Sequence, residues 1–576
     1  MAGARTALGN QEICVVDPRR RVRSADGRLK RRALALATAG ALLVSGSGVV
    51  VAAPGDRQAD LVRASDPDLF AACSTVGQPG TNFPDTEVEP YVAVNRARLG
   101  RQQAAPTFGL GTSEDAEGRN LIGVWQQDRW SDGGARGLVA AFSFDRGRTW
   151  GRTPLPFSSC APGGLKYQRA SDPWVSIGPD GTAYTVSLSA DGDQIRNAVA
   201  AATSSDGGRT WSNLNVIKAR GDDGSTRFFQ DKESVTADPL HPGVAYAVWD
   251  EIDFQQVTVP TLFSKTTDGG RTWSPARIIV NTGSRATPNP PGPQQTIGNQ
   301  IVADPRNGTL YNFFNLIQLR LRRGNPDRFN VAFVKSTDGG QTWTEPRIVA
   351  QLRSVGVVQP GTGAPTGSGD SATPVEPVPI SDFTANEDEG FAVSAGAAIR
   401  TGDILPEAAI DPSSGQLYVV WQDARFNGGN FDEVALSTSR DGGATWSTPI
   451  RVNTPTGKPA FTPAVQVDGD RKVAVTFYDF RNAQPGNTTT LPTDYFITFS
   501  DDRGATFEDE QHIAGPFNML AAPNARGFFV GDYEGLGVLG ESFLAFFAQT
   551  NCADNACAAT RPGTNPTDIF AARLEP

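Results

Sequence analysis

The stretch SSDGGRTW at residues 204–211 belongs to a phrase that occurs in six copies along this 576-residue chain. The copies are SFDRGRTW at 143–150, SSDGGRTW at 204–211, TTDGGRTW at 266–273, STDGGQTW at 336–343, SRDGGATW at 439–446 and SDDRGATF at 500–507. Successive copies start 61, 62, 70, 103 and 61 residues apart, which is the spacing of a tandem repeat. The chain is therefore a row of similar structural units.

Each position of the phrase suits a tight hairpin turn. Ser or Thr stands first, Asp third and Gly fifth, and the Asp carboxylate can accept hydrogen bonds from the amides of the turn. The aromatic residue at the eighth position would cover the hairpin from the side. The phrase predicts a structural brace and by itself predicts no chemistry.

Four short β-runs surround each copy of the phrase. In the third unit they are ESVTAD, VAYAVWD, TLFSKT and ARIIV, with the turn ADPLHPG after the first. Short, regularly spaced runs rich in Val, Ala and aromatic residues indicate antiparallel sheet, and four strands per unit are typical of a β-propeller blade. We therefore predict an all-β propeller with four-stranded antiparallel blades over residues 85–576, preceded by an N-terminal segment at 54–84.

The number of first runs favours seven blades. After the sixth phrase, RGFFVGDYEGLGVLGESFLAFFAQT and DIFAARLEP supply further strands without a phrase, and a strand from segment 60–90 could complete that blade. Six blades, with the tail as an extra layer, are the alternative. The longest interval contains a Pro/Gly/Ser-rich insertion at about 351–404, which we do not count as a blade.

Residues 1–53 have the pattern of a secretory signal peptide. Nine Lys and Arg residues precede the uncharged run ALALATAGALLVSGSGVVVAA at 33–53, which ends in small residues. Arg31 and Arg32 leave twin-arginine export open, although the rest of that motif is missing, and an uncleaved membrane anchor is the alternative. Gly and Ser in the run argue against an anchor, so we expect a secreted, extracellular protein.

The charge of the chain excludes one class of partner. The formal net charge is −10, and without residues 1–53 the chain has 43 basic and 59 acidic residues, a net charge of −16. This is the wrong sign for a protein that binds nucleic acid or an anionic membrane. We expect a monomer with no membrane-spanning segment in the mature chain.

Four of the five cysteines lie beyond residue 53, and an even number in an exported chain predicts two disulfides. The favoured pairing joins Cys552 to Cys557 and Cys73 to Cys160. In the alternative, Cys73 is linked to the C-terminal pair and joins the two ends of the ring.

Alternating strand direction decides which loops share an end of the propeller. The turns from first to second strands lie with the repeated phrases, at what we call the hairpin end. The loops from second to third strands and the starts of the first strands lie at the opposite end. Charged groups gather in these opposite loops: Asp128, Arg129, Arg169, Asp172, Asp231, Lys232, Glu233, Asp250, Glu251, Glu407, Asp423, Arg425, Asp479, Arg481, Asp532 and Glu534. They could form an active site, or they could pair between blades to seal the ring.

The repeated phrase resembles the Asp box of the sialidase superfamily of β-propellers. In sialidases a Tyr activated by a Glu attacks the sugar, an Asp is the general acid/base, and three Arg clamp the substrate carboxylate. Matched by chain order, this resemblance implies catalytic roles for Tyr533, Glu233 and Asp172, and substrate binding by Arg129, Arg425, Arg481, Asp423 and Asp479. The family's usual first-arginine motif, an aromatic residue followed by Arg-Ile-Pro, does not occur before the first phrase.

The leading hypothesis is therefore a secreted, exo-acting sialidase-like glycoside hydrolase that removes terminal sialic acid or a related acidic sugar from glycans. One alternative is a non-catalytic propeller that binds glycan or protein at the cell surface. Another is a hydrolase of neutral polysaccharide, for which Asp231, Glu233 and Asp423 would be the candidate carboxylates.

The sequence gives little support for metal or cofactor chemistry. The two histidines, His241 and His512, fall away from the loops that collect the charged groups, which argues against a Ser-His-Asp triad or a His-rich metal centre. Acidic turns at 191–193 and 222–224 could bind structural Ca²⁺. We expect no other cofactor.

Overall fold

The computed structural model describes residues 60–65, 67–96, 120–283, 294–319, 328–358, 398–484, 486–487, 489–554, 556–557 and 566–576. The predicted leader at 1–53 and the central part of the insertion, 359–397, lie outside these residues. Residues 57–576 make one compact unit. Its described part consists of β-strands and a short 3₁₀ turn at Met519–Ala521. The described residues contain no helix that is long and apolar enough to span a membrane.

Most of the described strands form seven antiparallel groups of four, so the chain is an all-β propeller. Groups 1 to 3 are β2 (Glu87–Val94), β3 (Leu121–Arg129), β4 (Ala135–Ser143) and β5 (Gly151–Leu155); β6 (Arg169–Ile177), β7 (Ala183–Ala190), β8 (Asn197–Ser204) and β9 (Ser212–Arg220); and β10 (Phe228–Ala237), β11 (Ala245–Asp253), β12 (Thr261–Thr266) and β13 (Arg277–Val280). A single pairing, Ala135 with Ala170, joins groups 1 and 2 into one sheet.

The remaining groups repeat this order of strands. Groups 4 to 7 are β14 (Gln294–Ala303), β15 (Leu310–Gln318), β16 (Arg328–Ser336) and β17 (Arg347–Gln351); β20 (Glu407–Ile410), β21 (Leu417–Asp423), β22 (Glu433–Ser439) and β23 (Ile450–Arg451); β24 (Ala460–Val467), β25 (Val473–Asp479), β26 (Pro492–Ser500) and β27 (Gln511–Asn518); and β29 (Gly535–Leu539), β30 (Ser542–Thr550), β31 (Thr567–Leu574) and β1 (Leu61–Arg63).

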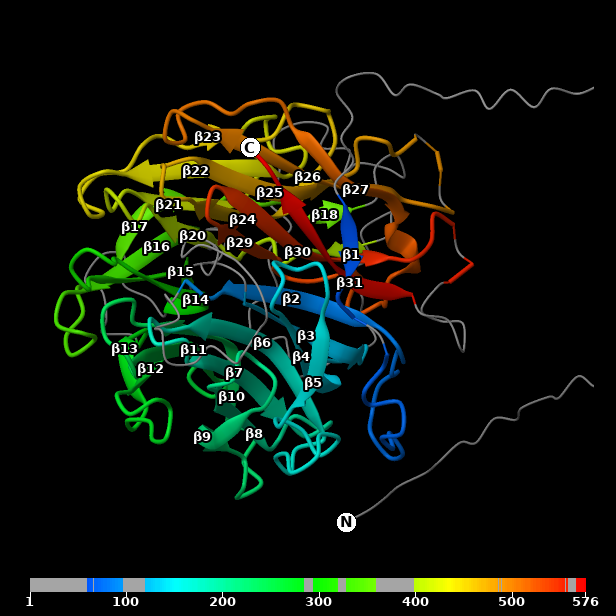
Figure 1. Cartoon of the computed structure of the whole chain (residues 1–576), viewed down its shortest axis with the longest axis vertical. Coiled ribbons are helices and arrows are strands. Elements are labelled where there is room, and N and C mark those ends of the chain that lie inside the picture. Colours follow the sequence, from blue (N-terminus) through cyan, green and yellow to red (C-terminus); the bar gives the residue numbers. More distant parts are fainter. Residues whose placement is uncertain are drawn as a thin grey trace, which may run out of the picture. The chain divides into compact units, whose positions relative to one another are not determined.

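The first strands of these groups form a closed cycle. Strand β2 contacts β6, and the contacts continue through β10, β14, β20, β24 and β29 back to β2. Group 7 takes its fourth strand from the N-terminal segment, because β1 pairs antiparallel with β31, as the blue and red strands of Figure 1 show. Seven blades stay our interpretation of this cycle.

Each repeated phrase closes a hairpin as its residue types predict. In the second copy, the Asp206 carboxylate accepts hydrogen bonds from the Thr210 amide at 3.0 Å and from the Thr210 hydroxyl at 2.6 Å. Ser204 Oγ donates to Asp206 Oδ1 at 2.8 Å and accepts from the Gly208 amide at 2.9 Å. The six phrases share this pattern of hydrogen bonds. The polar groups of the hairpin therefore satisfy one another.

The hairpins also hold neighbouring groups together. A Cβ built on Gly443, the fifth residue of its phrase, would lie 2.4 Å from Phe333 of the preceding group. Phe313 and Phe333 of group 4 pack in one buried cluster with Val419 and Trp421 of group 5. The apolar core thus lies between successive groups, and the glycine lets the hairpin close over it.

The hairpin end is the end predicted from strand direction. In group 3 the Gly269 amide of the phrase donates to the Gly243 carbonyl, in the turn from β10 to β11, at 2.9 Å. First-to-second turns and phrases therefore lie side by side. The starts of the first strands consequently lie at the other end of each group.

The two ends of the insertion are part of a small extra sheet. Strand β18 (Val357–Val358) pairs antiparallel with β19 (Ala398–Arg400), which pairs parallel with β28 (Phe528–Phe529). This sheet connects the insertion to the segment that leads into β29. It brings residues 400–407 next to residues 528–534.

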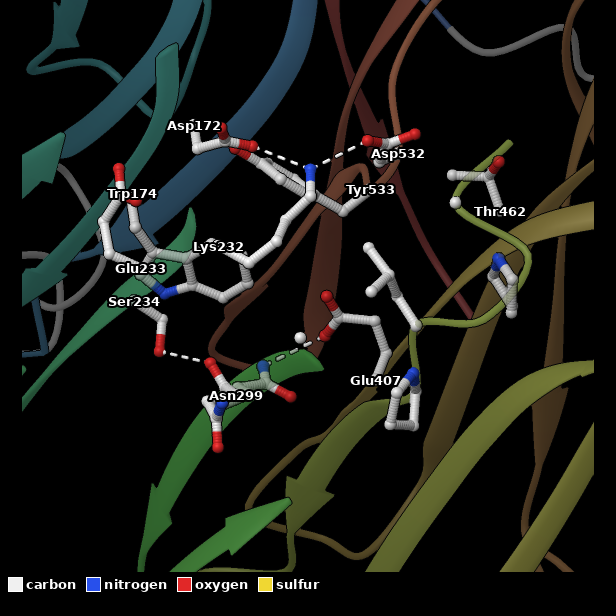
Figure 2. Close-up of a pocket in the computed structure, with 16 residues that line it drawn as sticks. Asp172, Trp174, Lys232, Glu233, Ser234, Asn299, Glu407, Thr462, Asp532 and Tyr533 are labelled. Atoms are coloured by element: carbon white, nitrogen blue, oxygen red, sulfur yellow. Dashed lines mark hydrogen bonds and ion pairs between the residues drawn. The ribbon is translucent and has the colours of Figure 1, made fainter. Parts of the chain in front are cut away.

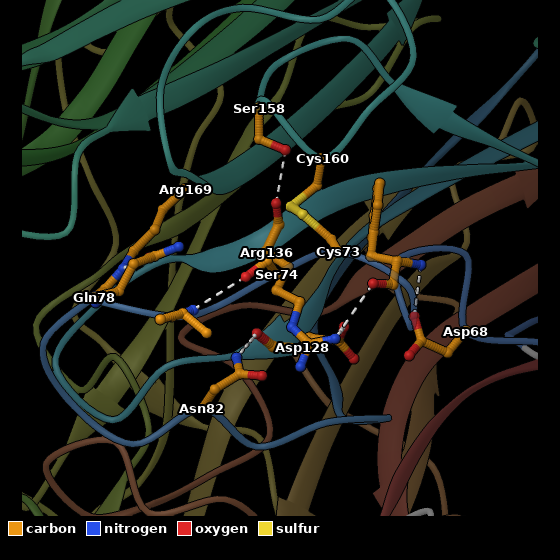
Figure 3. Close-up of a disulfide and its surroundings, with 12 residues drawn as sticks. Asp68, Cys73, Ser74, Gln78, Asn82, Asp128, Arg136, Ser158, Cys160 and Arg169 are labelled. Atoms are coloured by element: carbon orange, nitrogen blue, oxygen red, sulfur yellow. Dashed lines mark hydrogen bonds and ion pairs between the residues drawn. A yellow bond between two sulfur atoms is a disulfide. The ribbon is translucent and has the colours of Figure 1, made fainter.

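The favoured disulfide pairing is confirmed. Cys73 is bonded to Cys160 and Cys552 to Cys557. Figure 3 shows the first bridge beside Arg136, whose guanidinium lies 3.2 Å from Asp128 Oδ2 and donates to the Phe70 carbonyl. The bridge thereby anchors the N-terminal segment to group 1.

Candidate active site

Five of the first strands contain a β-bulge at the same point of the repeat. Each pairing register shifts there, and one bulge residue has a positive φ: Glu89 (54°), Asp172 (50°), Lys232 (50°), Gly298 (73°) and Thr462 (48°). Positive φ is uncommon for residues other than glycine, and a bulge re-aims the side chain it carries. The bulges form one ring of positions around the cycle of first strands.

A pocket opens at this ring, at what we call the pocket end. It has about 510 Å³ of empty space, including its opening to solvent. The lining combines acids, one lysine, aromatic rings and apolar residues of the insertion: Asp172, Trp174, Lys232, Glu233, Ser234, Gly298, Asn299, Gln300, Gly402, Leu405, Pro406, Glu407, Thr462, Pro463, Asp532 and Tyr533. Figure 2 shows the Lys232 nitrogen between the carboxylates of Asp172 and Asp532. The three predicted catalytic residues, Asp172, Glu233 and Tyr533, all line this pocket.

Lys232 is the hub of the charged network. Its Nζ lies 2.8 Å from Asp172 Oδ1, 2.7 Å from Asp532 Oδ2 and 3.4 Å from Glu89 Oε1. Burial opposes the charged ammonium, but the surrounding carboxylates outweigh it and raise the pKa of Lys232 well above its usual value. The single positive charge of Lys232 is therefore already shared by two carboxylates of the pocket.

Arg400, which the sequence interpretation missed, completes the neutralisation of Asp532. Its Nε lies 3.0 Å from Asp532 Oδ1 and its Nη2 lies 2.5 Å from Asp532 Oδ2, a bidentate pair. Burial opposes ionisation of Asp532, yet Arg400 and Lys232 hold its pKa well below the usual range. The predicted Arg129 lies on the same side, with Arg129 and Arg400 both over the Phe529 ring, at 5.1 and 4.4 Å.

Arg129 itself does not line the pocket. Its Nη1 donates to Gln126 Oε1 at 2.7 Å. Burial, followed by repulsion from Arg400, lowers the pKa of Arg129 to about 10. Arg129 is thus a buried support of the network.

Two other acids of the pocket have a raised pKa. Glu233 is 3% exposed, and neither of its carboxyl oxygens has a hydrogen-bond partner from another described residue. Burial, reinforced by Asp172, raises the pKa of Glu233 well above its usual value. Burial also raises the pKa of Glu407 to about 8, against the opposing hydrogen bond from Gln300. The pocket therefore holds acids in two protonation states.

Aromatic rings form one wall. Trp174 stacks on Tyr91 with ring centroids 3.6 Å apart, and Tyr533 meets Trp174 edge-on at 5.2 Å. The Tyr533 hydroxyl donates to the Pro173 carbonyl at 3.2 Å. Burial and the neighbouring acids raise the pKa of Tyr533 well above its usual value. This is the direction opposite to the one that activates a tyrosine nucleophile.

Arg425 and Arg481 were expected at the pocket, and the structure does not bring them there. Arg425 pairs with Asp423 at 2.6 Å and donates to the carbonyl of Gln351 in β17. Arg481 pairs with Asp479 and with Glu510, each at 2.6 Å. In both loops an Asp two residues earlier, in the same group, binds the guanidinium, so these ion pairs lie within a group and do not join neighbouring blades. Asp423 and Asp479, the predicted binding acids, are occupied in the same pairs.

Other sequence candidates also take local partners. Asp231 accepts a hydrogen bond from the Lys232 amide at 3.0 Å, and burial, followed by Asp172, raises its pKa to about 6. At the acidic turns proposed for Ca²⁺, Arg196 pairs with Asp191 at 3.1 Å and with Asp222 at 3.2 Å. The described ranges contain no group of three His, Cys, Asp or Glu side chains that could hold a metal ion.

Glu89 and Arg400 were not named among the sequence candidates, and Lys232 and Glu407 were named only among the gathered charged groups, without a role. Aligned first runs, EVEPYVAV, ASDPWVSI, QDKESVTA, TIGNQIVA and AFTPAVQV, place the bulge residues in one column. That column was a usable signal for Glu89 and Lys232. Arg400 comes from the insertion, whose sequence outside the repeat gave no such signal.

No protein-family model and no curated protein matches this chain. The solved structures that resemble it include the following three. An α-L-arabinanase of Penicillium chrysogenum in complex with arabinobiose is 12% identical, with 86% of this chain and 95% of that chain covered and a TM-score of 0.38. A Hadza microbial sialidase is 14% identical, with 86% and 91% covered and a TM-score of 0.40. A PL25 ulvan lyase bound to a GlcA–Rha3S unit is 11% identical, with 86% and 96% covered and a TM-score of 0.45. At these values the likenesses assign neither a substrate nor a reaction to this chain.

Proposed function

We propose that the chain is an exported glycoside hydrolase that acts on an uncharged sugar at the end of a glycan. The observation that carries this proposal is the coexistence, in one aromatic-walled pocket, of two raised-pKa acids, Glu233 and Glu407, with the ion-paired carboxylate Asp172. Hydrolysis of a glycosidic bond needs one carboxylic acid and one carboxylate. A site can supply this acid and this carboxylate together when its two carboxyl groups lie in different environments.

The charge balance favours an uncharged sugar over an acidic one. A sugar carboxylate needs a free cation, preferably a guanidinium fork. The Arg400 fork is bound to Asp532, and Lys232 is bound to both Asp532 and Asp172. A neutral sugar needs no such cation, and Trp174, Leu405 and Pro406 give the pocket apolar lining that suits it.

Asp172 is the carboxylate that we assign to the attacking side. Lys232 keeps it oriented at 2.8 Å, and in this role it accepts a proton from the attacking water. The two disulfides support an oxidising, extracellular location, in line with the predicted leader at 1–53.

The test is hydrolysis of a panel of 4-nitrophenyl glycosides of neutral pyranoses and furanoses, with a fluorogenic sialoside beside them. We expect turnover of at least one neutral glycoside, and a loss of about 10²- to 10⁴-fold in kcat for Asp172→Asn. The matched control is Glu433→Gln, which removes a buried acid bound to Arg451 and Asn427 away from the pocket lining. Absence of turnover on every neutral glycoside, or an Asp172→Asn variant as active as the control, contradicts the proposal.

A sialidase is the second candidate, because Asp172, Glu233 and Tyr533 gather in one pocket as that resemblance implies. Its signature would be sialoside cleavage that Tyr533→Phe abolishes. For an uncharged-sugar hydrolase, Tyr533→Phe loses the hydrogen bond to Pro173 and retains most of its activity.

A further inference from the structure

We propose that Glu407, oriented by Gln300, is the proton donor to the leaving group of this hydrolase. The inference rests on the proposed function and names a catalytic residue within it. Figure 2 shows the Glu407 carboxyl directed toward the centre of the pocket, opposite Lys232 and the two aspartates bound to it. Glu407 is the first residue of β20, so its position is fixed by the group 5 sheet and by the adjoining end of the insertion.

Gln300 determines which oxygen of Glu407 carries the proton. The Ala408 amide donates to Gln300 Oε1 at 2.8 Å, which leaves the Gln300 amide nitrogen facing Glu407. Gln300 Nε2 then donates to Glu407 Oε2 at 3.0 Å. Because Oε2 is occupied as an acceptor, the acid proton resides on Oε1. Gln300 thus acts as a positioning residue.

The surroundings of Glu407 keep that proton in place at neutral pH. Burial raises the pKa of Glu407 to about 8. Around it stand Gln300 from β14, the partly buried Tyr91 from β2, and the pocket charges: Lys232, Asp172, Glu233 and Asp532. Lys232 and Arg400 are already bound to Asp172 and Asp532. Within the described part of the chain, Glu407 therefore has no ion pair that would favour loss of its proton.

Glu233 is the competing acid, and its environment suits the role less well. It neighbours Asp172, which helps to raise the pKa of Glu233, so its deprotonation would put two negative charges side by side. Glu407 has no carboxylate among the causes of its raised pKa. A proton donor becomes a carboxylate during the reaction, so it needs surroundings in which no other carboxylate repels that charge.

The reaction balances with groups already in the pocket. The Glu407 Oε1 proton passes to the glycosidic oxygen as the bond from that oxygen to the anomeric carbon breaks. A water molecule forms the new bond to the anomeric carbon, and its proton passes to Asp172. Exchange with solvent then returns a proton to Glu407 and removes one from Asp172. The products are a free sugar and an alcohol.

The experiment compares Glu407→Gln and Glu233→Gln on two substrates of the same sugar, a disaccharide and a 4-nitrophenyl glycoside. Nitrophenolate leaves without a proton, whereas the sugar alcohol does not. We expect Glu407→Gln to lose about 10²- to 10⁴-fold in kcat on the disaccharide and far less on the nitrophenyl glycoside. Glu233→Gln should affect both substrates equally. Equal losses on both substrates for Glu407→Gln, or none, overturn the inference.

The pH profile provides a readout that a structural role would not change. The wild-type rate should fall as pH rises through about 8, where Glu407 ionises. Gln300→Leu removes a hydrogen bond that lowers this pKa, so the alkaline limb should move to higher pH. An unmoved limb in Gln300→Leu would show that Glu407 does not set it.

Failure of the proposed function can be told apart from failure of this inference. If the wild type cleaves glycosides and Glu407→Gln behaves as wild type, the hydrolase stands and the donor assignment falls. If the wild type cleaves no glycoside, the proposed function falls. Infrared difference spectra between pH 6 and pH 9.5 then show whether the Glu407 carboxyl carries a proton at neutral pH. A protonated-carboxyl band that titrates near pH 8 and disappears in Glu407→Gln supports the assignment, and its absence overturns it.

Discussion

The hairpin end and the pocket end are built from the same repeat, yet their carboxyl groups have opposite surroundings. At the hairpin end, Asp206 accepts hydrogen bonds from Thr210 and Ser204 of its own phrase. At the pocket end, Asp172 depends on Lys232 from the next group, and Glu233 has no partner from another described residue. The hairpin acids are satisfied locally, whereas the pocket acids depend on residues far apart in the sequence.

This difference separates stability from function within one repeat. A hairpin that satisfies itself can be repeated six times with the same hydrogen bonds, because the polar groups of each copy need no partner from a distant part of the chain. A bulge position can hold Glu, Asp, Lys, Gly or Thr, because the fold needs only its backbone shape. The bulge position, whose residue type differs between groups, is therefore the place in the repeat where an active site can be assembled.

The largest expected difference between the two ends comes from replacing Lys232, the lysine at the centre of the charged network of the pocket end. Lys232→Met leaves Asp172, Asp532 and Glu89 buried without their shared cation. Removing one partner of a buried ionic network destabilises by about 3–5 kcal/mol. Urea denaturation should show this loss in the free energy of unfolding.

The matched control is a lysine at the hairpin end. Lys265 Nζ donates to the Gly339 carbonyl at 3.2 Å and lies over the Tyr246 ring, so Lys265→Met should cost no more than about 1 kcal/mol. Adding Asp172→Asn to Lys232→Met should recover part of the loss, because the two residues interact directly. Similar losses for both lysines would mean that the two ends do not differ in the way we infer.

The sequence predicted the hairpin end far better than the pocket end. The phrase specifies its own hydrogen bonds, and the favoured cysteine pairing was right. Of the pocket, it predicted Asp172, Glu233 and Tyr533. It failed for Arg425 and Arg481, because strand direction gives the end of a blade at which a loop lies and not its distance from the centre. A local Asp two residues before each Arg was the contrary signal.

A smaller effect tests whether the hairpins also join neighbouring groups. Gly443 and Gly429 have similar positive φ values, 83° and 88°, but a Cβ would lie 2.4 Å from Phe333 at Gly443 and more than 4 Å from any atom at Gly429. Gly429→Ala should cost about 1–2 kcal/mol from backbone strain alone. Gly443→Ala should cost about 1–3 kcal/mol more, because Phe333 must move. Equal costs in thermal or urea unfolding would show that the hairpin does not press on the preceding group.

The smallest expected effect concerns the acid dependence of a single hairpin. Hydrogen bonds from the Thr272 hydroxyl and amide lower the pKa of Asp268 to about 2, whereas an unfolded Asp has a pKa of about 3.9. The folded pKa is the lower one, so this carboxylate stabilises the fold above about pH 3.9, and the contribution is lost as pH falls toward 2. The stability difference between wild type and Asp268→Asn should therefore be larger at pH 6 than at pH 2. The control is Asp509→Asn, at an exposed position outside the repeated phrases. A difference for Asp268→Asn that does not shrink in acid would mean that the hairpin does not depend on the charge of its Asp.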